Sequence, residues 1–171
     1  MNAYKCPRCT ATLKTIDYDG VEIETCPVCE GEWLDAGELR EIVQNVERRF
    51  NPDEIQQLNN IRERIVKLKE LAHERLLCPK CPGQKLRPFN YACGSGIILD
   101  KCPNCGGIWL DRGELEMVQA VVDEWKSHVS RDRRLSDDTK KKILEKTEDE
   151  SGTGALRSRV SYVLAVLRSF L

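Results

Sequence analysis

Two cysteine pairs near the start of the chain recur further along it, and this duplication limits the fold more than any other feature. Cys6-Pro7-Arg8-Cys9 returns as Cys78-Pro79-Lys80-Cys81, and Cys26-Pro27-Val28-Cys29 returns as Cys102-Pro103-Asn104-Cys105. A nearly identical string follows each second pair, Gly-Glu-Trp-Leu-Asp-Ala-Gly-Glu-Leu in one copy and Gly-Ile-Trp-Leu-Asp-Arg-Gly-Glu-Leu in the other. The chain must therefore build one small module twice.

The spacing of the cysteines is typical of a four-thiolate zinc site, with 16 residues between the pairs in the first copy and 20 in the second. Two cysteines separated by two residues can place both sulfurs on one side of a tight turn, about 2.3 Å from a shared ion. Buried thiols or disulfides are the alternative, which these spacings disfavour. We predict two Zn²⁺ ions per chain, held by Cys6, Cys9, Cys26, Cys29, Cys78, Cys81, Cys102 and Cys105.

The composition explains why such a chain needs a metal. Aromatic residues make up 6% of the 171 residues and charged residues 32%, so a large apolar core cannot be built and a staple is needed. The first residues contain no apolar stretch typical of a secretory signal, and no segment is long enough to cross a bilayer. We therefore expect a cytoplasmic protein whose reduced thiols bind metal.

The predicted zinc sites are structural. Catalytic zinc keeps one coordination position open and usually has histidine or carboxylate ligands. Each module instead offers four cysteines, and both histidines, His73 and His128, lie outside the modules. The repeated Asp and Glu after each Trp-Leu could serve in acid–base chemistry, but helix capping explains both. We predict no catalytic residue and no enzymatic activity.

Each module is predicted to form a β-hairpin that leads into a helix. Residues 20–24 alternate apolar and polar as a return strand would, residues 96–100 occupy the same place, and the four extra residues of the second copy fit the hairpin tip. Asp35 and Asp111 each precede a Glu by three positions, which indicates capping boxes at two helix starts. The apolar stripes that follow are Leu39, Ile42, Val43, Val46 and Phe50, and Leu115, Val118, Val121, Val122 and Trp125.

Three residues have both a structural and a functional interpretation. Trp33 and Trp109 could form a recognition surface, but a small core needs its few aromatic side chains, so we favour packing of each Trp over its zinc site. The ninth cysteine, Cys93, lies in the spacer of the second copy, away from both pairs. We interpret it as a spare reduced thiol, with a redox sensor as the alternative.

The fold class predicted from these features is a small zinc-dependent α+β protein. Two four-cysteine zinc ribbons, each with its helix, occupy residues 1–50 and 78–128, and a long helix over 51–77, capped by Asn51, joins them. Its apolar seam would pack on the module helices or on a second chain. A charged helix and a flexible linker follow over residues 129–154.

Residues 155–171 are predicted to form an amphipathic C-terminal helix. Its apolar face consists of Leu156, Val160, Val163, Leu164, Leu167, Phe170 and Leu171. The segment is too short and too charged to cross a bilayer. This face would fold back on the protein or associate with a second copy, dock into the groove of a protein partner, or, least favoured, lie on a membrane surface.

The repeated string Cys-Pro-x-Cys, spacer, Cys-Pro-x-Cys-x-Gly-x-Trp-Leu-Asp-x-Gly-Glu-Leu resembles the transcription-factor-IIB-type zinc-finger family. The resemblance covers about residues 4–50 and 76–126, and the first copy differs slightly, with Cys29-Glu30-Gly31 in place of Cys-Gly-Gly. It implies a zinc ribbon and, by the family's name, nucleic-acid binding. A shared fold does not by itself fix a function.

The charge distribution favours a protein-binding role over a nucleic-acid-binding one. Residues 1–50 carry six Lys/Arg against ten Asp/Glu, and residues 78–126 carry six of each, whereas a ribbon that binds phosphate should present a basic face. The sequence therefore predicts an adaptor that holds macromolecular partners, with a transcription-associated nucleic-acid binder as the alternative. For the alternative, the candidate contacts are Arg131, Arg133, Arg134, Lys140, Lys141 and Lys142.

Overall fold

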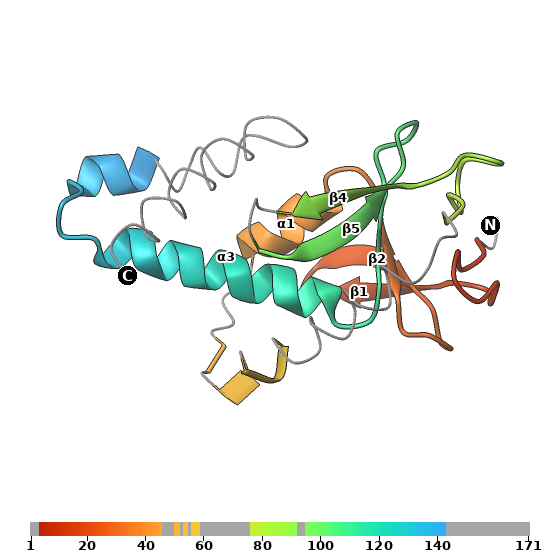
Figure 1. Cartoon of the computed structure of the whole chain (residues 1–171), viewed down its shortest axis with the longest axis horizontal. Coiled ribbons are helices and arrows are strands. Elements are labelled where there is room, and N and C mark those ends of the chain that lie inside the picture. Colours follow the sequence, from red (N-terminus) through yellow and green to blue (C-terminus); the bar gives the residue numbers. More distant parts are fainter. Residues whose placement is uncertain are drawn as a thin grey trace.

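A computed structural model describes residues 4–45, 50–51, 53–54, 56–58, 76–91 and 95–142. In this part of the chain six strands form one antiparallel sheet, in the order β1-β2-β3-β6-β5-β4, and two helices, α1 and α3, lie against it (Figure 1). The elements are β1 Lys14–Tyr18, β2 Val21–Thr25, β3 Glu32–Leu34, α1 Glu38–Asn45, β4 Arg87–Tyr91, β5 Ile97–Lys101, β6 Ile108–Leu110 and α3 Glu114–Arg131.

Both predicted β-hairpins are present. Strands β1 and β2 pair through a two-residue turn, Asp19-Gly20, in which both residues have positive φ, as the twist of a tight hairpin requires. The offset between equivalent residues is 72 at the first cysteines, 73 at the first residues of β1 and β4, and 76 at the first residues of β2 and β5. Three extra residues therefore lie at the tip and one lies in the loop after Cys81, so placing all four at the tip was wrong.

The two modules are joined through their third strands. Strands β3 and β6 pair antiparallel, with Trp33 opposite Trp109, Glu32 opposite Leu110 and Leu34 opposite Ile108. This reciprocal register relates the modules by an approximate two-fold axis between the two tryptophans. The sequence predicts two ribbons connected by a helix, and the single shared sheet is a feature of the structure that was not predicted.

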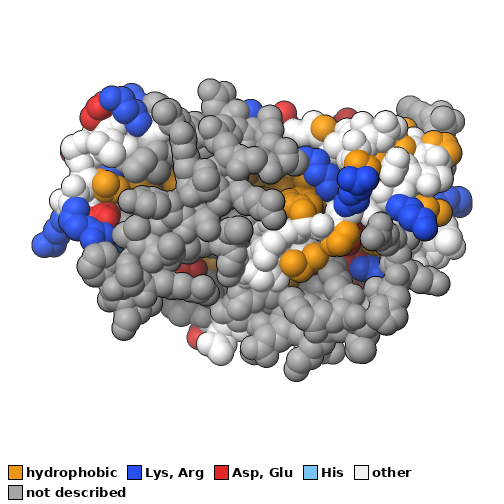
Figure 2. Space-filling model, turned by 45° about the horizontal axis from the view of Figure 1, so that its top comes forward, with side chains coloured by type: hydrophobic (Ala, Val, Ile, Leu, Met, Phe, Trp, Pro, Cys, Tyr) orange, Lys and Arg blue, Asp and Glu red, His pale blue; other side chains and the backbone are white. Residues whose placement is uncertain are grey.

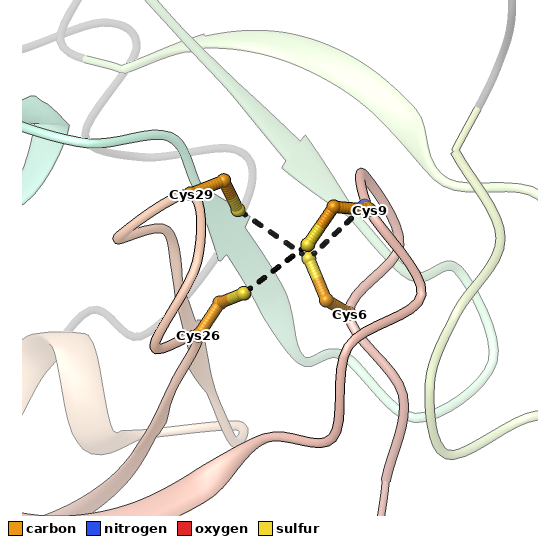
Figure 3. A group of neighbouring side chains, drawn as sticks. All are labelled: Cys6, Cys9, Cys26 and Cys29. Atoms are coloured by element: carbon orange, nitrogen blue, oxygen red, sulfur yellow. Dashed lines mark hydrogen bonds between the residues drawn. The ribbon is translucent and has the colours of Figure 1, made fainter.

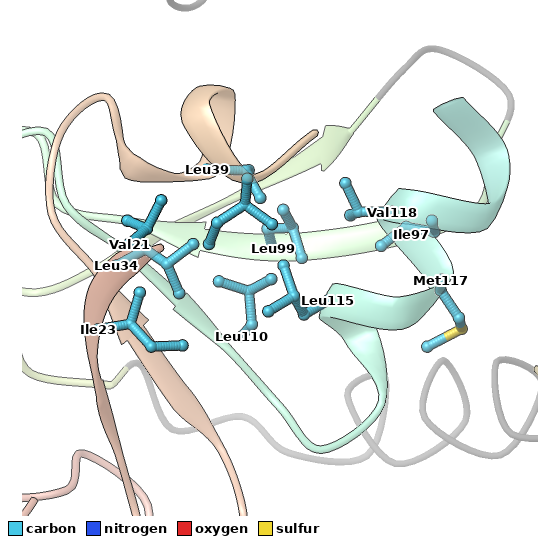
Figure 4. Packing of buried hydrophobic residues seen from close by; sticks show 11 residues of the cluster. Val21, Ile23, Leu34, Leu39, Ile97, Leu99, Leu110, Leu115, Met117 and Val118 are labelled. Carbon is cyan, nitrogen blue, oxygen red and sulfur yellow. The ribbon is translucent and has the colours of Figure 1, made fainter. Parts of the chain in front are cut away.

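The sheet has a separate apolar cluster on each face because side chains alternate along every strand. Leu34 and Leu110 point toward the helices, where they pack with residues of β2, β5, α1 and α3 (Figure 4). Trp33 and Trp109 point to the other face, into a cluster that contains four of the cysteines. The helix stripes are confirmed in part, since Leu39, Ile42, Leu115, Val118 and Trp125 are buried and Val43 and Val121 pack half-buried against the helix-side cluster. Val122 is half-buried, Val46 lies outside the described residues, and Phe50 lies beyond the described end of α1 and is not helical.

The two helix starts differ from the predicted capping boxes in one respect. Glu38 accepts a hydrogen bond from the backbone N–H of Asp35 at 2.6 Å, and Glu114 accepts one from Asp111 at 2.8 Å, as a capping box predicts. The residue just before each helix, however, is a glycine with positive φ. The aspartates stand two residues before that glycine, and their carboxylates bond to tryptophan and to the opposite module instead.

Part of the segment between the modules is also described. Asn51 accepts a hydrogen bond from the N–H of Glu54, and Glu54 accepts one from the N–H of Asn51, both at 2.9 Å, so the predicted cap at Asn51 is confirmed. Leu58 packs half-buried against the helix-side cluster. Most of the predicted linking helix, His73, Cys93 and the tail over 155–171 lie outside the described residues. Among the described helices, none is both long and apolar enough to cross a membrane.

Candidate metal centres

The first four-cysteine cluster brings together the two loops at one end of the first hairpin. Cys6 and Cys9 lie in the loop before β1, Cys26 and Cys29 lie in the loop after β2, and all four sulfurs point toward one another (Figure 3). The Sγ atoms of Cys6 and Cys29 are 3.5 Å apart, and those of Cys9 and Cys26 are 3.3 Å apart. All four sulfurs lie within 4.8 Å of one another.

The second cluster repeats this arrangement in the second module. The sulfurs of Cys78, Cys81, Cys102 and Cys105 lie within 4.8 Å of one another, and those of Cys78 and Cys105 are 3.7 Å apart. A tetrahedral ion with Zn–S bonds of about 2.3 Å requires sulfurs about 3.8 Å apart. Each cluster therefore fits one zinc ion, and the chain fits two.

The loops that carry the cysteines are built to present thiolates. In the first loop the backbone N–H groups of Arg8 and Cys9 donate to Cys6 Sγ at 3.3 and 3.4 Å. In the second module the N–H of Cys81 donates to Cys78 Sγ at 3.2 Å, and the side-chain amide of Asn104 donates to Cys81 Sγ at 3.3 Å. N–H donors stabilise the negative charge that a metal-binding sulfur carries.

The pKa values of the cysteine thiols also indicate that a cation is needed for all four sulfurs of a cluster to be ionised. Burial raises the pKa of the Cys6 and Cys78 thiols well above the usual range. Burial also opposes ionisation of Cys26 and Cys102, but backbone N–H groups and neighbouring thiols outweigh it and lower the pKa of each to about 7. Four thiolates can therefore share one small site only when a cation compensates their charge.

A zinc ion with four thiolate ligands has no open coordination position, so its role is to hold the fold together. One cysteine of each pair is buried, with Cys6, Cys26, Cys78 and Cys102 between 0% and 6% exposed. Around them pack Leu13, Leu76, Leu86 and both tryptophans. Zinc would thus fix the two loops of each module and the apolar cluster between the modules.

Both tryptophans are fully buried, as the packing interpretation predicted. Each one lies against a glycine of the opposite module: a Cβ atom at Gly31 would overlap the ring of Trp109, and one at Gly107 would overlap the ring of Trp33. The indole N–H of Trp33 donates to Asp35 at 3.1 Å, and that of Trp109 donates to Asp111 at 3.0 Å. The repeated Gly-x-Trp-Leu-Asp string therefore builds the junction between the modules.

Ion pairs across this junction were not predicted from the sequence. Arg8 bonds to Asp111 at 2.9 and 2.7 Å, and the equivalent Lys80 bonds to Asp35 at 2.6 Å and to Glu24 at 2.9 Å. A signal was available, because both copies carry a basic residue inside the first cysteine pair and an aspartate two residues after the tryptophan. Without knowledge that the modules pair, nothing connected those two positions.

The candidate nucleic-acid contacts lie at and beyond the end of α3, away from the zinc loops. Arg134 pairs with Asp132 at 2.8 Å, Lys142 with Asp138 at 2.7 Å, and the remaining members are Arg131, Arg133, Lys140 and Lys141. On the face in Figure 2, Lys and Arg side chains occur at both ends of the molecule, and acidic side chains lie beside those at one end. The candidate partner-binding residues of the tail lie outside the described residues.

Comparison with known proteins identifies the modules. The family described as transcription factor zinc-finger, of the zinc-ribbon type, matches residues 5–45 and 77–120. Searches of curated proteins and of solved structures gave no match. The two matched segments coincide with the two four-cysteine clusters and with the strands and helix starts that position them. The two modules therefore match the transcription factor zinc-finger family as tandem zinc ribbons, and they are joined in one sheet.

Proposed function

We propose that this chain is a non-catalytic zinc-binding adaptor that holds a protein partner. The proposal rests on one observation, that basic side chains of the two ribbons form ion pairs inside the molecule. Arg8 and Lys80, the basic residues of the two first cysteine loops, both bond to carboxylates of the opposite module. The charge of these two residues is therefore already compensated, and they would release few counterions on DNA binding.

The basic cluster beyond α3 supports the same conclusion. Arg134 lies beside Asp132, Lys140 lies 3.6 Å from Asp137, and Lys142 pairs with Asp138. A carboxylate next to each cation repels phosphate and lowers the gain from a phosphate contact. These pairs are typical of a solvated helix face.

A non-catalytic role follows from the ligand sets. Each zinc ion would have four cysteine ligands, and such an ion cannot bind a water molecule or a substrate without losing a ligand. Its contribution is stability, which in small zinc folds amounts to about 10–16 kcal/mol per structural site. The adaptor would thus be a double ribbon, held together by zinc, that presents its remaining segments to a partner.

The partner-binding element that we propose is the C-terminal segment 155–171. Seven large apolar residues share one face of this segment when it is helical, and each would forgo about 1.5–3 kcal/mol if left in water. Such a face requires a covering surface. We propose that a protein groove covers it, with self-association and a membrane surface as outcomes that the experiment below separates.

The experiment is affinity capture with the full chain beside a chain that ends at Glu150, with protein and nucleic acid measured in both eluates. The double variant Leu164→Asp/Leu167→Asp should lose the protein partner and keep both zinc ions, while Ser158→Ala, opposite the apolar face when the segment is helical, should behave as the unaltered chain. Retention of every partner, together with an unchanged oligomeric state, in the double variant would exclude the tail from the adaptor function.

The family match favours one alternative, a transcription-associated nucleic-acid binder. The two functions differ in the affinity expected for duplex DNA at physiological salt. An adaptor of this charge should bind it with a Kd weaker than about 10⁻⁶ M, the tight end of the usual non-specific range. Tighter binding that falls steeply as salt increases, and that is lost when Arg131 and Arg133 are replaced by Gln, would establish the alternative.

A further inference from the structure

Each zinc centre is framed by residues of the opposite module. Arg8 lies between Cys6 and Cys9, and its guanidinium donates to Asp111 of the second module, from Nε to Oδ1 at 2.9 Å and from Nη2 to Oδ2 at 2.7 Å. Lys80 holds the equivalent place in the second module and donates to Asp35 of the first at 2.6 Å. The first bridge is partly shielded from water, since the Arg8 and Asp111 side chains are 28% and 19% exposed, and in the second Lys80 is 18% exposed and Asp35 45%.

The same aspartates position the tryptophans. Asp111 Oδ1 accepts from both Arg8 and the indole of Trp109, and Trp109 packs on Gly31, two residues after Cys29. The pair Trp109–Asp111 therefore touches both cysteine loops of the first zinc centre, although it belongs to the second module. By the two-fold relation, Trp33–Asp35 does the same for the second centre through Lys80 and Gly107.

The position of each Trp-Asp string depends in turn on its own zinc centre. Asp35 follows Cys29 by six residues, and Asp111 follows Cys105 by the same number. Short strands of three residues, β3 and β6, carry the strings from these cysteines to the junction. When one centre lacks zinc, its second loop is no longer fixed, and the string that supports the other centre loses its anchor.

We propose that the two zinc centres are energetically coupled, so that zinc bound at either centre raises the affinity of the other through the bridges Arg8–Asp111–Trp109 and Lys80–Asp35–Trp33. The coupling is reciprocal by thermodynamic necessity, and couplings of this kind typically change affinity by about 5–150-fold. Arg8 and Lys80 act as positioning residues, because they contact the supporting aspartates and not the metal.

The test is native mass spectrometry of the reduced full chain supplied with one zinc ion per chain. Two equal and independent sites would leave about half of the molecules with one zinc, whereas a tenfold coupling lowers that share to about a quarter. Arg8→Met/Lys80→Met should raise the one-zinc share above that of the unaltered chain. Arg8→Lys should keep the original share, since lysine serves at the equivalent position 80.

The matched control is Arg112→Met. Arg112 also crosses the junction, to Glu30 at 3.1 Å, but these side chains are 72% and 58% exposed and neither lies in the Trp-Asp bridge. Its replacement should leave the distribution unchanged. The proposal is overturned if the unaltered chain and Arg8→Met/Lys80→Met show the same one-zinc share. It is also overturned if Arg112→Met raises that share as much as Arg8→Met/Lys80→Met does. If the double variant fails to bind two zinc ions at excess zinc, Arg8→Met alone is judged by the same criterion.

Discussion

The two modules share the cysteines that hold zinc and the Gly-x-Trp-Leu-Asp string of the junction, and they differ where each third strand faces the helix layer. Position 32 of the first module is Glu, and the equivalent position 108 of the second is Ile. Position 40 in α1 is Arg, and the equivalent position 116 in α3 is Glu. The duplicated fold therefore tolerates substitutions between the sheet and the helices, and a few of them place acidic side chains in this layer.

In the first module this layer contains a partly buried acidic side chain, Glu32. Burial raises the pKa of Glu32 to about 8, and the nearby charge of Glu116 adds to this effect. Among the described residues, Glu32 Oε2 and Glu116 Oε2 are buried without a hydrogen-bond partner. Tyr18 lies near both, and burial followed by the charge of Glu116 raises its pKa to about 12. At the position equivalent to Glu32, the second module has Ile108, which needs no hydrogen-bond partner.

The largest effect should follow the loss of a zinc ligand. Cys26→Ser and Cys102→Ser remove equivalent ligands, and each should bring the zinc content below two per chain because a structural site contributes about 10–16 kcal/mol. Cys102→Ser should also lose more helical circular dichroism, since α3 has 18 residues and α1 has eight. A full complement of zinc in either variant would contradict the assigned ligand sets.

Alanine at the junction glycines should have the next largest effect. At Gly31 a Cβ would overlap Trp109 and also lie 3.0 Å from the backbone oxygen of Leu110, whereas at Gly107 its three nearest neighbours are all atoms of the Trp33 ring. We expect a loss of unfolding free energy of about 3 kcal/mol for Gly31→Ala and about 2 kcal/mol for Gly107→Ala.

Chemical denaturation of the zinc-loaded chain measures this difference. Gly20→Ala is the control, because a Cβ there meets nothing within 4 Å and the cost is limited to its positive φ, about 1 kcal/mol. Junction variants that unfold no earlier than the Gly20→Ala control would show that the tryptophans do not pack across the two modules.

Replacing Glu32 with a neutral side chain should make the first module resemble the second, which has the uncharged Ile108 at the equivalent position. The unfolded chain releases the Glu32 proton near pH 4.5, while the folded chain keeps it up to about pH 8. The stability that protonated Glu32 contributes is therefore complete below pH 4.5 and is lost as pH rises toward 8. Glu32→Gln should raise the unfolding free energy at pH 8 by on the order of 2 kcal/mol.

The measurement is denaturation at several pH values between about 5 and 8, inside the window between the two pKa values of Glu32. The gain for Glu32→Gln should grow across that interval, and Glu116→Gln should show a smaller gain of the same sign because burial, the larger cause, remains. A gain that stays constant with pH would mean that Glu32 is ionised in the folded protein throughout.

The smallest effect is expected at Cys93, the cysteine that the second module has in addition. Cys93→Ser should leave the zinc content and the unfolding midpoint unchanged, because the second four-cysteine cluster is complete without it. Elemental analysis beside the unaltered chain measures this. Loss of one zinc ion would assign the thiol to a metal site.

The zinc ligands could be predicted because cysteine spacing alone limits which sulfurs can share an ion. The hairpins and the apolar stripes of both helices could be predicted from periodicity, which depends on residues near in sequence. The β3–β6 pairing could not, because strands of three residues give no periodic signal and their pairing joins positions 33 and 109. For the same reason Asp35 and Asp111 were interpreted locally, as caps, when their partners Lys80 and Arg8 lie in the other module.

The zinc content of the purified, reduced full chain, together with its far-ultraviolet circular dichroism before and after chelation, tests the central claim most directly. The account predicts two zinc ions per chain and loss of the folded signal when a strong chelator removes them, because both apolar clusters depend on loops that the cysteines hold. One zinc ion or none, or a helical signal that persists in full after the metal is removed, would contradict it.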